Sequence, residues 1–131
     1  MRRASGTGNA LNRAVQAAEF AGTTLVLAPH MDDESLGCGL LLASRPDKQR
    51  LHVGFATDGA RSPARPGQTR AEAKELAALR RQEALAALGV LGVPEGNTAF
   101  LDFEDGTLRS RRSQLEGALA SLIGRLQPAW V

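Results

Sequence analysis

Residues 28–37 read Ala-Pro-His-Met-Asp-Asp-Glu-Ser-Leu-Gly and decide what the rest of the chain is expected to form. One imidazole and three carboxylates lie within five positions here, directly after the apolar residues 24–28. A continuous apolar run with β-branched members is typical of a strand buried on both faces of a parallel sheet. Because open α/β sheets keep their chemistry beyond the carboxyl ends of their strands, we expect a functional site to begin at His30.

The residue types in this stretch favour a metal-dependent reaction. A histidine and an aspartate together suit a zinc-like divalent ion, and a second aspartate beside a ligand can take a proton from water that the metal polarises. A structural role is the alternative, because aspartate caps helices well and a lone histidine near a strand end commonly makes ordinary hydrogen bonds. One cap needs one aspartate, so capping explains Asp32 and Asp33 together poorly. Glu34 suits the positive end of the helix that follows.

The rest of the chain alternates between strand and helix patterns. Strands are predicted at 23–28, 51–57 and 98–103, with the start of a fourth at 128–131, and helices at 35–45, 70–88 and 113–126. Thr69 with Glu72 and Ser113 with Glu116 predict capping boxes, and Gly89 predicts a helix end. The alternation predicts an α/β fold with a doubly wound, mostly parallel sheet and right-handed crossovers.

Polar residues also follow the second and third predicted strands. Asp58 precedes Gly59, and Asp105 precedes Gly106. The carboxyl ends of parallel strands lie on one edge of the sheet, so both aspartates are expected near His30. Because Asp-Gly pairs are also common in turns, these two residues are either turn formers or hydrogen-bonding partners of the site.

Length and composition restrict the class of protein. The chain has 131 residues, enough for one domain, and we expect an N-terminal extension with a short helix over 1–22 and the domain over 23–131. A net charge of +2 and 4% aromatic residues argue against nucleic acid binding. No apolar run approaches the roughly 20 residues that span a membrane. A single cysteine allows no intrachain disulfide, which fits a cytoplasmic location.

Residues 29–39 resemble the signature of the PIG-L/LmbE-like N-acetylglucosaminyl deacetylase family. Further short matches follow in the family's order: Thr57-Asp58-Gly59, Arg80-Arg81-Gln82-Glu83, Leu88-Gly89-Val90 and Phe103-Glu104-Asp105-Gly106. The resemblance covers residues 23–131 and implies a Rossmann-like, LmbE-like fold. It also implies hydrolysis of the N-acetyl group of a GlcNAc-type sugar conjugate, a small-molecule substrate.

The same resemblance implies a role for each residue that matches the family's motifs. His30 and Asp33 match the ligands of Zn²⁺, or of another divalent metal. Asp32 matches the general base that takes a proton from the attacking water. Arg80 matches the arginine of the Arg-x-x-Glu element, which suits a contact to sugar hydroxyls or a phosphate.

The resemblance is to the N-terminal part of the family only. Family members carry a later His-x-Asp-His element that supplies a third ligand, and the sequence ends at Val131 before such an element. Its other histidine, His52, lies at the start of the second predicted strand and so at the wrong end of the sheet. We therefore expect a C-terminally truncated domain that is weakly active or inactive, and a non-catalytic sugar- or partner-binding module is the alternative function.

Two further expectations concern the surface. The loop at 60–70 carries Arg61, Arg65 and Arg70 after a strand end, so a mobile flap that contacts an anionic part of the substrate is a hypothesis. A fourth strand that is cut short would leave a sheet edge open, and open edges invite association. A homo-oligomer is therefore expected.

Overall fold

The computed structural model describes residues 21–61 and 66–131, so the helix predicted within 1–22 and the expectation for Arg65 lie outside the described residues. The elements follow in the order β1 (Thr24–Ala28), α1 (Asp33–Ser44), η1 (Lys48–Arg50), β2 (Leu51–Thr57), α2 (Arg70–Leu91), η2 (Glu95–Asn97), β3 (Thr98–Phe103) and α3 (Arg112–Leu126). The predicted α/β fold class is confirmed. No helix within the described ranges is both long and apolar enough to span a membrane.

The three strands form a parallel sheet in the order β1-β2-β3. On the free side of β1, Trp130 forms a parallel bridge with Thr24, and the Leu25 amide donates a hydrogen bond of 2.9 Å to the Trp130 carbonyl. The predicted start of a fourth strand is therefore present as a single bridge. The chain moves outward from β1 to β3 and then returns to the opposite side of β1, so the strand order reverses at β1. Ligands of open α/β sheets bind at such a reversal.

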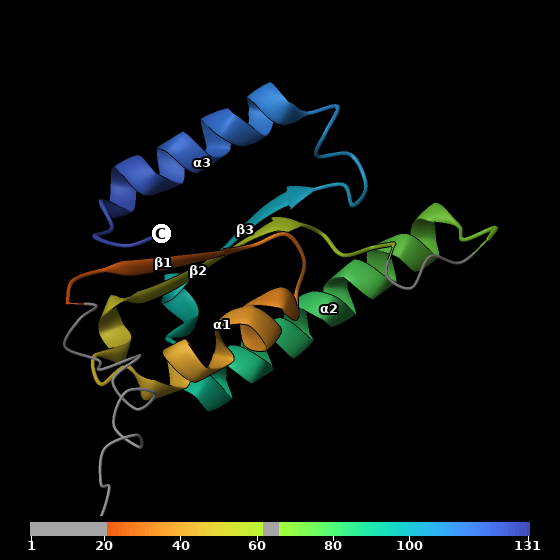
Figure 1. Ribbon diagram of the computed structural model, residues 1–131. Coiled ribbons are helices and arrows are strands. Elements are labelled where there is room, and N and C mark those ends of the chain that lie inside the picture. The colour runs from red at the N-terminus through yellow and green to blue at the C-terminus, as the bar shows by residue number, and fades with distance from the viewer. Residues whose placement is uncertain (1–20, 62–65) are drawn as a thin grey trace, which may run out of the picture.

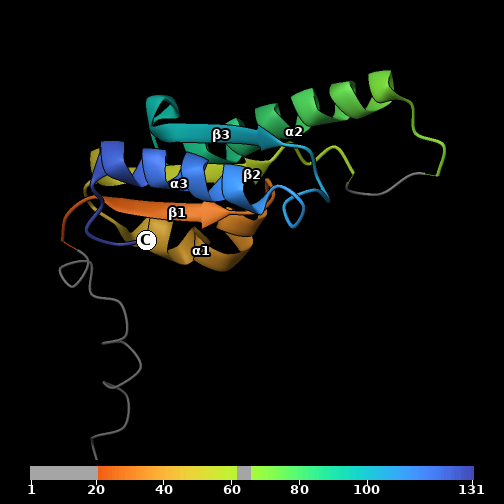
Figure 2. The same cartoon turned by 90° about the horizontal axis from the view of Figure 1, so that it is seen from above.

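Helices cover both faces of the sheet, as the doubly wound prediction requires. Helices α1 and α2 lie on one face and α3 lies on the other (Figure 1). The face that carries α1 and α2 holds the main core, to which β2 contributes its alternate residues Leu51, Val53 and Phe55. Alternation of this kind follows from the two-residue repeat of a strand. The amino-terminal part of α2 continues beyond the carboxyl end of the sheet (Figure 2).

Glycine at position 54 allows α3 to approach the opposite face. A Cβ atom on Gly54 would lie 3.0 Å from the Leu27 Cδ2 and 3.2 Å from the Leu122 Cδ2. Leu122 is the buried residue of α3. The missing side chain therefore sets how closely α3 packs on β1 and β2.

The structure confirms one predicted capping box and contradicts the other. The Thr69 hydroxyl accepts a hydrogen bond from the Glu72 amide, and the Glu72 carboxylate accepts one from the Thr69 amide. At α3, however, the cap is Arg111, whose side chain makes no capping bond. Ser113 lies inside the helix because Arg112 is already helical, so its hydroxyl is not at the position that caps.

Two helix ends also differ from the prediction. Helix α1 begins at Asp33, two positions before the predicted start, so part of the acidic motif forms its first turn. Helix α2 continues through Gly89 to Leu91 and ends at Gly92, which has a left-handed conformation with φ of 80°. The prediction that this helix ends at Gly89 was wrong, because a residue in the left-handed conformation, and not the presence of a glycine alone, ends a helix.

Candidate functional site

Hydrogen bonds across the carboxyl edge of the sheet bring the polar strand ends together. The Thr57 amide and hydroxyl both donate to the Pro29 carbonyl, at 3.0 and 2.8 Å. The Asp58 amide donates to the Phe103 carbonyl at 2.9 Å. The residues that follow β1, β2 and β3 are thereby fixed against one another, as the parallel topology predicted.

His30 lies between two carboxylates that meet its two ring nitrogens. Its Nδ1 is 3.2 Å from the Asp33 Oδ2, and its Nε2 is 3.0 Å from the Asp105 Oδ1. The His30 amide also donates to the Asp33 Oδ2 at 3.1 Å. The side chains of His30 and Asp33 are 42% and 41% exposed, whereas that of Asp105 is 11% exposed. The imidazole is thus held from a buried side and open on the side of Asp33.

Asp58 and Asp105 form the support behind His30. The Asp58 Oδ1 accepts hydrogen bonds from the Asp105 amide at 3.1 Å and the Ala60 amide at 3.0 Å. The Asp105 Oδ2 accepts one from the Arg61 amide at 3.3 Å. Both aspartates lie where partners of the site were predicted. Asp58 also shapes its own turn, so the two alternatives for this residue are compatible.

The surroundings of His30 change its protonation in the metal-free protein. Burial lowers the pKa of the imidazole, but hydrogen bonds and charge attraction from Asp105 and then Asp33 outweigh burial, and the pKa is raised above 6.5 overall. The imidazolium can donate to both carboxylates at once, which is the physical cause of the increase. A metal ion would have to displace the proton that faces Asp33.

Asp32 occupies the cap position of α1 in an unusual backbone conformation. Its φ is 140° and its ψ is −27°, and its side chain makes no capping hydrogen bond. Its amide donates to the Glu34 Oε2 at 2.9 Å. The capping alternative therefore does not account for the Asp32 carboxylate.

A small cavity of about 220 Å³ collects four of the predicted site residues. It is lined by His30, Met31, Asp32, Asp33, Gly59 and Arg80. Arg80 comes from the middle of α2, and its Nη1 donates to the Glu83 Oε2 at 3.2 Å. The structure thus brings the predicted metal ligands, the predicted base and the predicted substrate contact to one cavity.

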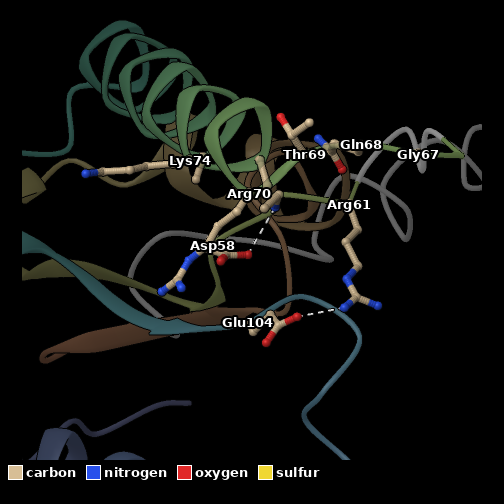
Figure 3. A pocket seen from close by; sticks show the side chains of 11 residues that line it. Asp58, Arg61, Gly67, Gln68, Thr69, Arg70, Lys74 and Glu104 are labelled. Atoms are coloured by element: carbon tan, nitrogen blue, oxygen red, sulfur yellow. Dashed lines mark hydrogen bonds and ion pairs between the residues drawn. The ribbon is translucent and has the colours of Figure 1, made fainter.

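A second cavity of about 880 Å³ adjoins the first at residues 58–60. Arg70 and Lys74, on the first turns of α2, are among its lining residues, and so are Arg61 and Glu104, which Figure 3 shows paired with each other. The Arg61 Nη2 and the Glu104 Oε1 are 2.7 Å apart. Two arginines of the predicted flap, Arg61 and Arg70, therefore line a cavity next to the candidate site.

The atoms of His30 and Asp33 fit two ligands of one divalent ion. Tetrahedral zinc with bonds of about 2.0 to 2.1 Å places neighbouring ligand atoms about 3.3 Å apart, and the Nδ1 and Oδ2 are 3.2 Å apart. A metal-binding histidine typically donates its other ring nitrogen to a carboxylate, as His30 can to Asp105. Within 21–61 and 66–131, however, no three His, Cys, Asp or Glu side chains are grouped so as to hold a metal.

A family model described as PIG-L, GlcNAc-PI de-N-acetylase, matches residues 25–131. The chain belongs to this family. The resemblance carried by the first motif is thereby confirmed.

A solved structure agrees with the family assignment. The chain is similar to N,N'-diacetylchitobiose deacetylase from Pyrococcus horikoshii, in complex with its inhibitor MPG, with a TM-score of 0.70 and 23% identity. The match covers 98% of this chain and 49% of that chain, so the chain spans about half the length of the relative. This similarity confirms the LmbE-like fold. No curated protein matches the chain.

Proposed function

We propose that this domain hydrolyses the N-acetyl group of a GlcNAc-type sugar conjugate, with Zn²⁺ or another divalent ion held by His30 and Asp33. The observation that carries the proposal is the placement of the His30 Nδ1 and the Asp33 Oδ2 at 3.2 Å, beside Asp32 and Arg80 in one cavity. Membership in a de-N-acetylase family supports it. A bound ion would supply Lewis acidity, which polarises an amide carbonyl and acidifies water.

The residues of the chain divide the remaining work. Asp32 accepts a proton from the water that adds to the acetyl carbonyl, and it can return this proton to the nitrogen when the C–N bond breaks. The products are acetate and a free amine. Asp105 fixes the orientation of the His30 ring through the Nε2. Asp58 in turn fixes Asp105 by accepting a hydrogen bond from the Asp105 amide. Arg80 binds sugar hydroxyls or a phosphate of the substrate.

A non-catalytic sugar- or partner-binding module is the second candidate. The observation that favours it is the number of donors, because the described residues supply two metal ligands and catalytic zinc sites normally have three. Both candidates use the same cavity. They differ in whether the N–acetyl bond is broken.

Acetate release separates the two candidates. The purified chain, loaded with Zn²⁺, is incubated with N-acetylglucosamine conjugates, and free amine and acetate are measured beside D32N. Turnover that D32N reduces at least a hundredfold supports the deacetylase. Sugar binding that survives in D32N, with no turnover in either protein, supports the binding module. If the wild-type chain shows no turnover and no sugar binding, both candidates are contradicted.

The larger cavity suggests where the remainder of the conjugate lies. Arg70 and Lys74 lie one helical turn apart on α2 and both line it. If they contact an anionic part of the substrate, R70Q and K74Q each raise KM several-fold with kcat unchanged. K48Q at the amino end of the sheet is the matched control. An unchanged KM for both cavity variants would contradict this contact.

The cytoplasmic location and the homo-oligomer remain predictions. Size-exclusion chromatography with light scattering tests the second of these. A monomer at all accessible concentrations would contradict the expectation that the edge of β1 associates.

A further inference from the structure

Glu34 is a buried acid beside the candidate site for which the proposed reaction has no use. Its side chain is 1% exposed in the first turn of α1. It is not among the residues that line either cavity. Charged side chains are almost never buried without a partner, so the contacts of Glu34 indicate what it is for.

Both oxygens of Glu34 accept hydrogen bonds from its neighbours in the motif. The Oε2 accepts from the Asp32 amide at 2.9 Å, and the Oε1 accepts from the Ser35 hydroxyl at 2.7 Å. A helix-end charge alone would not require these contacts. The carboxylate is instead tied to the residue that precedes the helix.

The residue that Glu34 holds has the strained backbone of this site. Asp32 has a φ of 140°, a region that residues with a Cβ rarely adopt. Such conformations persist where the surroundings over-determine them, and they cluster at functional sites. Since φ is the torsion about the N–Cα bond, fixing the Asp32 N–H fixes the amide plane against which the rest of Asp32, including its side chain, is rotated.

We propose that Glu34 is a positioning residue that holds Asp32 in this conformation and thereby directs the Asp32 carboxylate into the small cavity. The holding role rests on the hydrogen bond and the backbone geometry. The directing role also rests on the proposed function, in which Asp32 is the base. The two parts have separate readouts.

A double-mutant cycle tests the holding role without any need for activity. D32G and D32A both remove the carboxylate, but only glycine adopts a φ of 140° without strain. They are compared in the wild-type background and in E34M, which fills the space of Glu34 but has no oxygen to accept the amide. The free energy of unfolding is measured by urea denaturation of the metal-free proteins.

The expected result is that D32G is the more stable of the two variants when Glu34 is present. In E34M this order reverses, because residue 32 is released and alanine then gains from its smaller freedom in the unfolded chain. The same difference between D32G and D32A in both backgrounds would overturn the proposal. E34Q is the conservative control, since its amide oxygen can still accept the N–H, and it keeps the wild-type order.

Hydrogen exchange of the wild-type protein keeps the proposal testable if E34M does not fold. The Asp32 amide is expected to exchange slowly in the wild-type protein and at least tenfold faster in a folded E34M. An Asp32 amide that exchanges in the wild-type protein as fast as in the unfolded chain would overturn the proposal by itself.

The directing role is read from deacetylation kinetics. E34M is expected to lower kcat at least tenfold with KM and zinc affinity unchanged, and E34Q is expected to restore most of the loss. An E34M protein with wild-type kcat would overturn the directing role. A wild-type chain without turnover would instead contradict the proposed function, and the cycle on residue 32 would remain readable.

Discussion

The two ends of the sheet are both rich in polar side chains, but these side chains have different partners. At the amino end, Arg45, Lys48 and Asn97 donate to backbone carbonyls, for example from the Arg45 Nη2 to the Gly22 carbonyl at 2.9 Å and from the Lys48 Nζ to the Ala43 carbonyl at 2.8 Å. At the carboxyl end, the imidazole and carboxylates of the motif contact one another.

From this difference we infer that the polar groups at the amino end are structural and that those at the carboxyl end are available for binding. A side chain that pairs with a backbone carbonyl replaces a missing backbone partner. His30 and Asp33, which pair with each other at the edge of a cavity, are 42% and 41% exposed, so they can still exchange a proton or bind a ligand. We therefore expect substitutions at the amino end to change stability and those at the carboxyl end to change binding.

The largest expected contrast is between H30A and N97A. H30A removes the imidazole that we propose as a metal ligand, so the zinc affinity measured by calorimetry should fall at least a hundredfold while the fold is retained. N97A removes two hydrogen bonds of 2.9 Å to the Gln49 and Leu51 carbonyls. Its free energy of unfolding should fall by about 1 to 3 kcal/mol, with zinc affinity unchanged. Weaker zinc binding in N97A, or retained binding in H30A, would contradict the division.

A smaller effect is expected from the support behind His30. D105N exchanges the carboxylate that meets the Nε2 for an amide, and loss of such a partner typically costs about 10- to 100-fold in metal affinity. D102N is the matched control, since Asp102 is exposed near the end of β3 and pairs with Arg81. Zinc titration should show a loss for D105N alone. An equal loss of zinc affinity in both variants would mean that the affinity depends on the net charge of the protein and not on the contact between Asp105 and His30.

The strands were predictable because their boundaries are local. Residues 51–57 and 98–103 coincide with β2 and β3, where β-branched and aromatic runs meet Gly, Pro and Asn. The α3 cap was not predictable from its motif, because Ser113 and Glu116 have the capping spacing whether or not the helix begins earlier. In the structure, Glu116 accepts from the Arg112 Nε at 2.6 Å instead.

The residues of the candidate site could be named from the sequence, but their contacts could not. The motif itself named His30 and its acids, yet which distant aspartate meets His30 depends on the register of β3. That register shifts between Phe55 and Thr57, which pair with Phe100 and Phe103. The extra residue accompanies a φ of 54° at Asp102. A register shift of this kind changes which side chains beyond it face the site. No feature of the sequence predicts this shift.

Glu34 shows a second limit of reading the motif. Its place in the first turn of α1 agrees with the predicted preference for a positive helix end. Its contact to the Asp32 amide depends on the positive φ of Asp32. A non-glycine residue in that region carries no sequence signal, so the contact is visible only in the structure.

The smallest expected effect is on the pH dependence of stability, and it has opposite signs for the two histidines. At the carboxyl end, the pKa of His30 is raised above 6.5 by Asp105 and Asp33, against the effect of burial. Its stabilising contribution is therefore complete below pH 6.5 and is lost as the pH rises through the raised pKa. At the amino end, burial lowers the pKa of His52 below 6.5. Its contribution is present above pH 6.5 and is lost as the pH falls through the lowered pKa.

Urea denaturation from pH 5 to 8 with a chelator present separates the two contributions. The stability difference between the wild type and H30Q should shrink as the pH rises above about 6.5, where the unfolded imidazole loses its proton first. The difference between the wild type and H52Q should instead shrink as the pH falls below that value. If both stability differences change with pH in the same direction, the two histidines do not have pKa values shifted in opposite directions, and the contrast between the two ends of the sheet is contradicted.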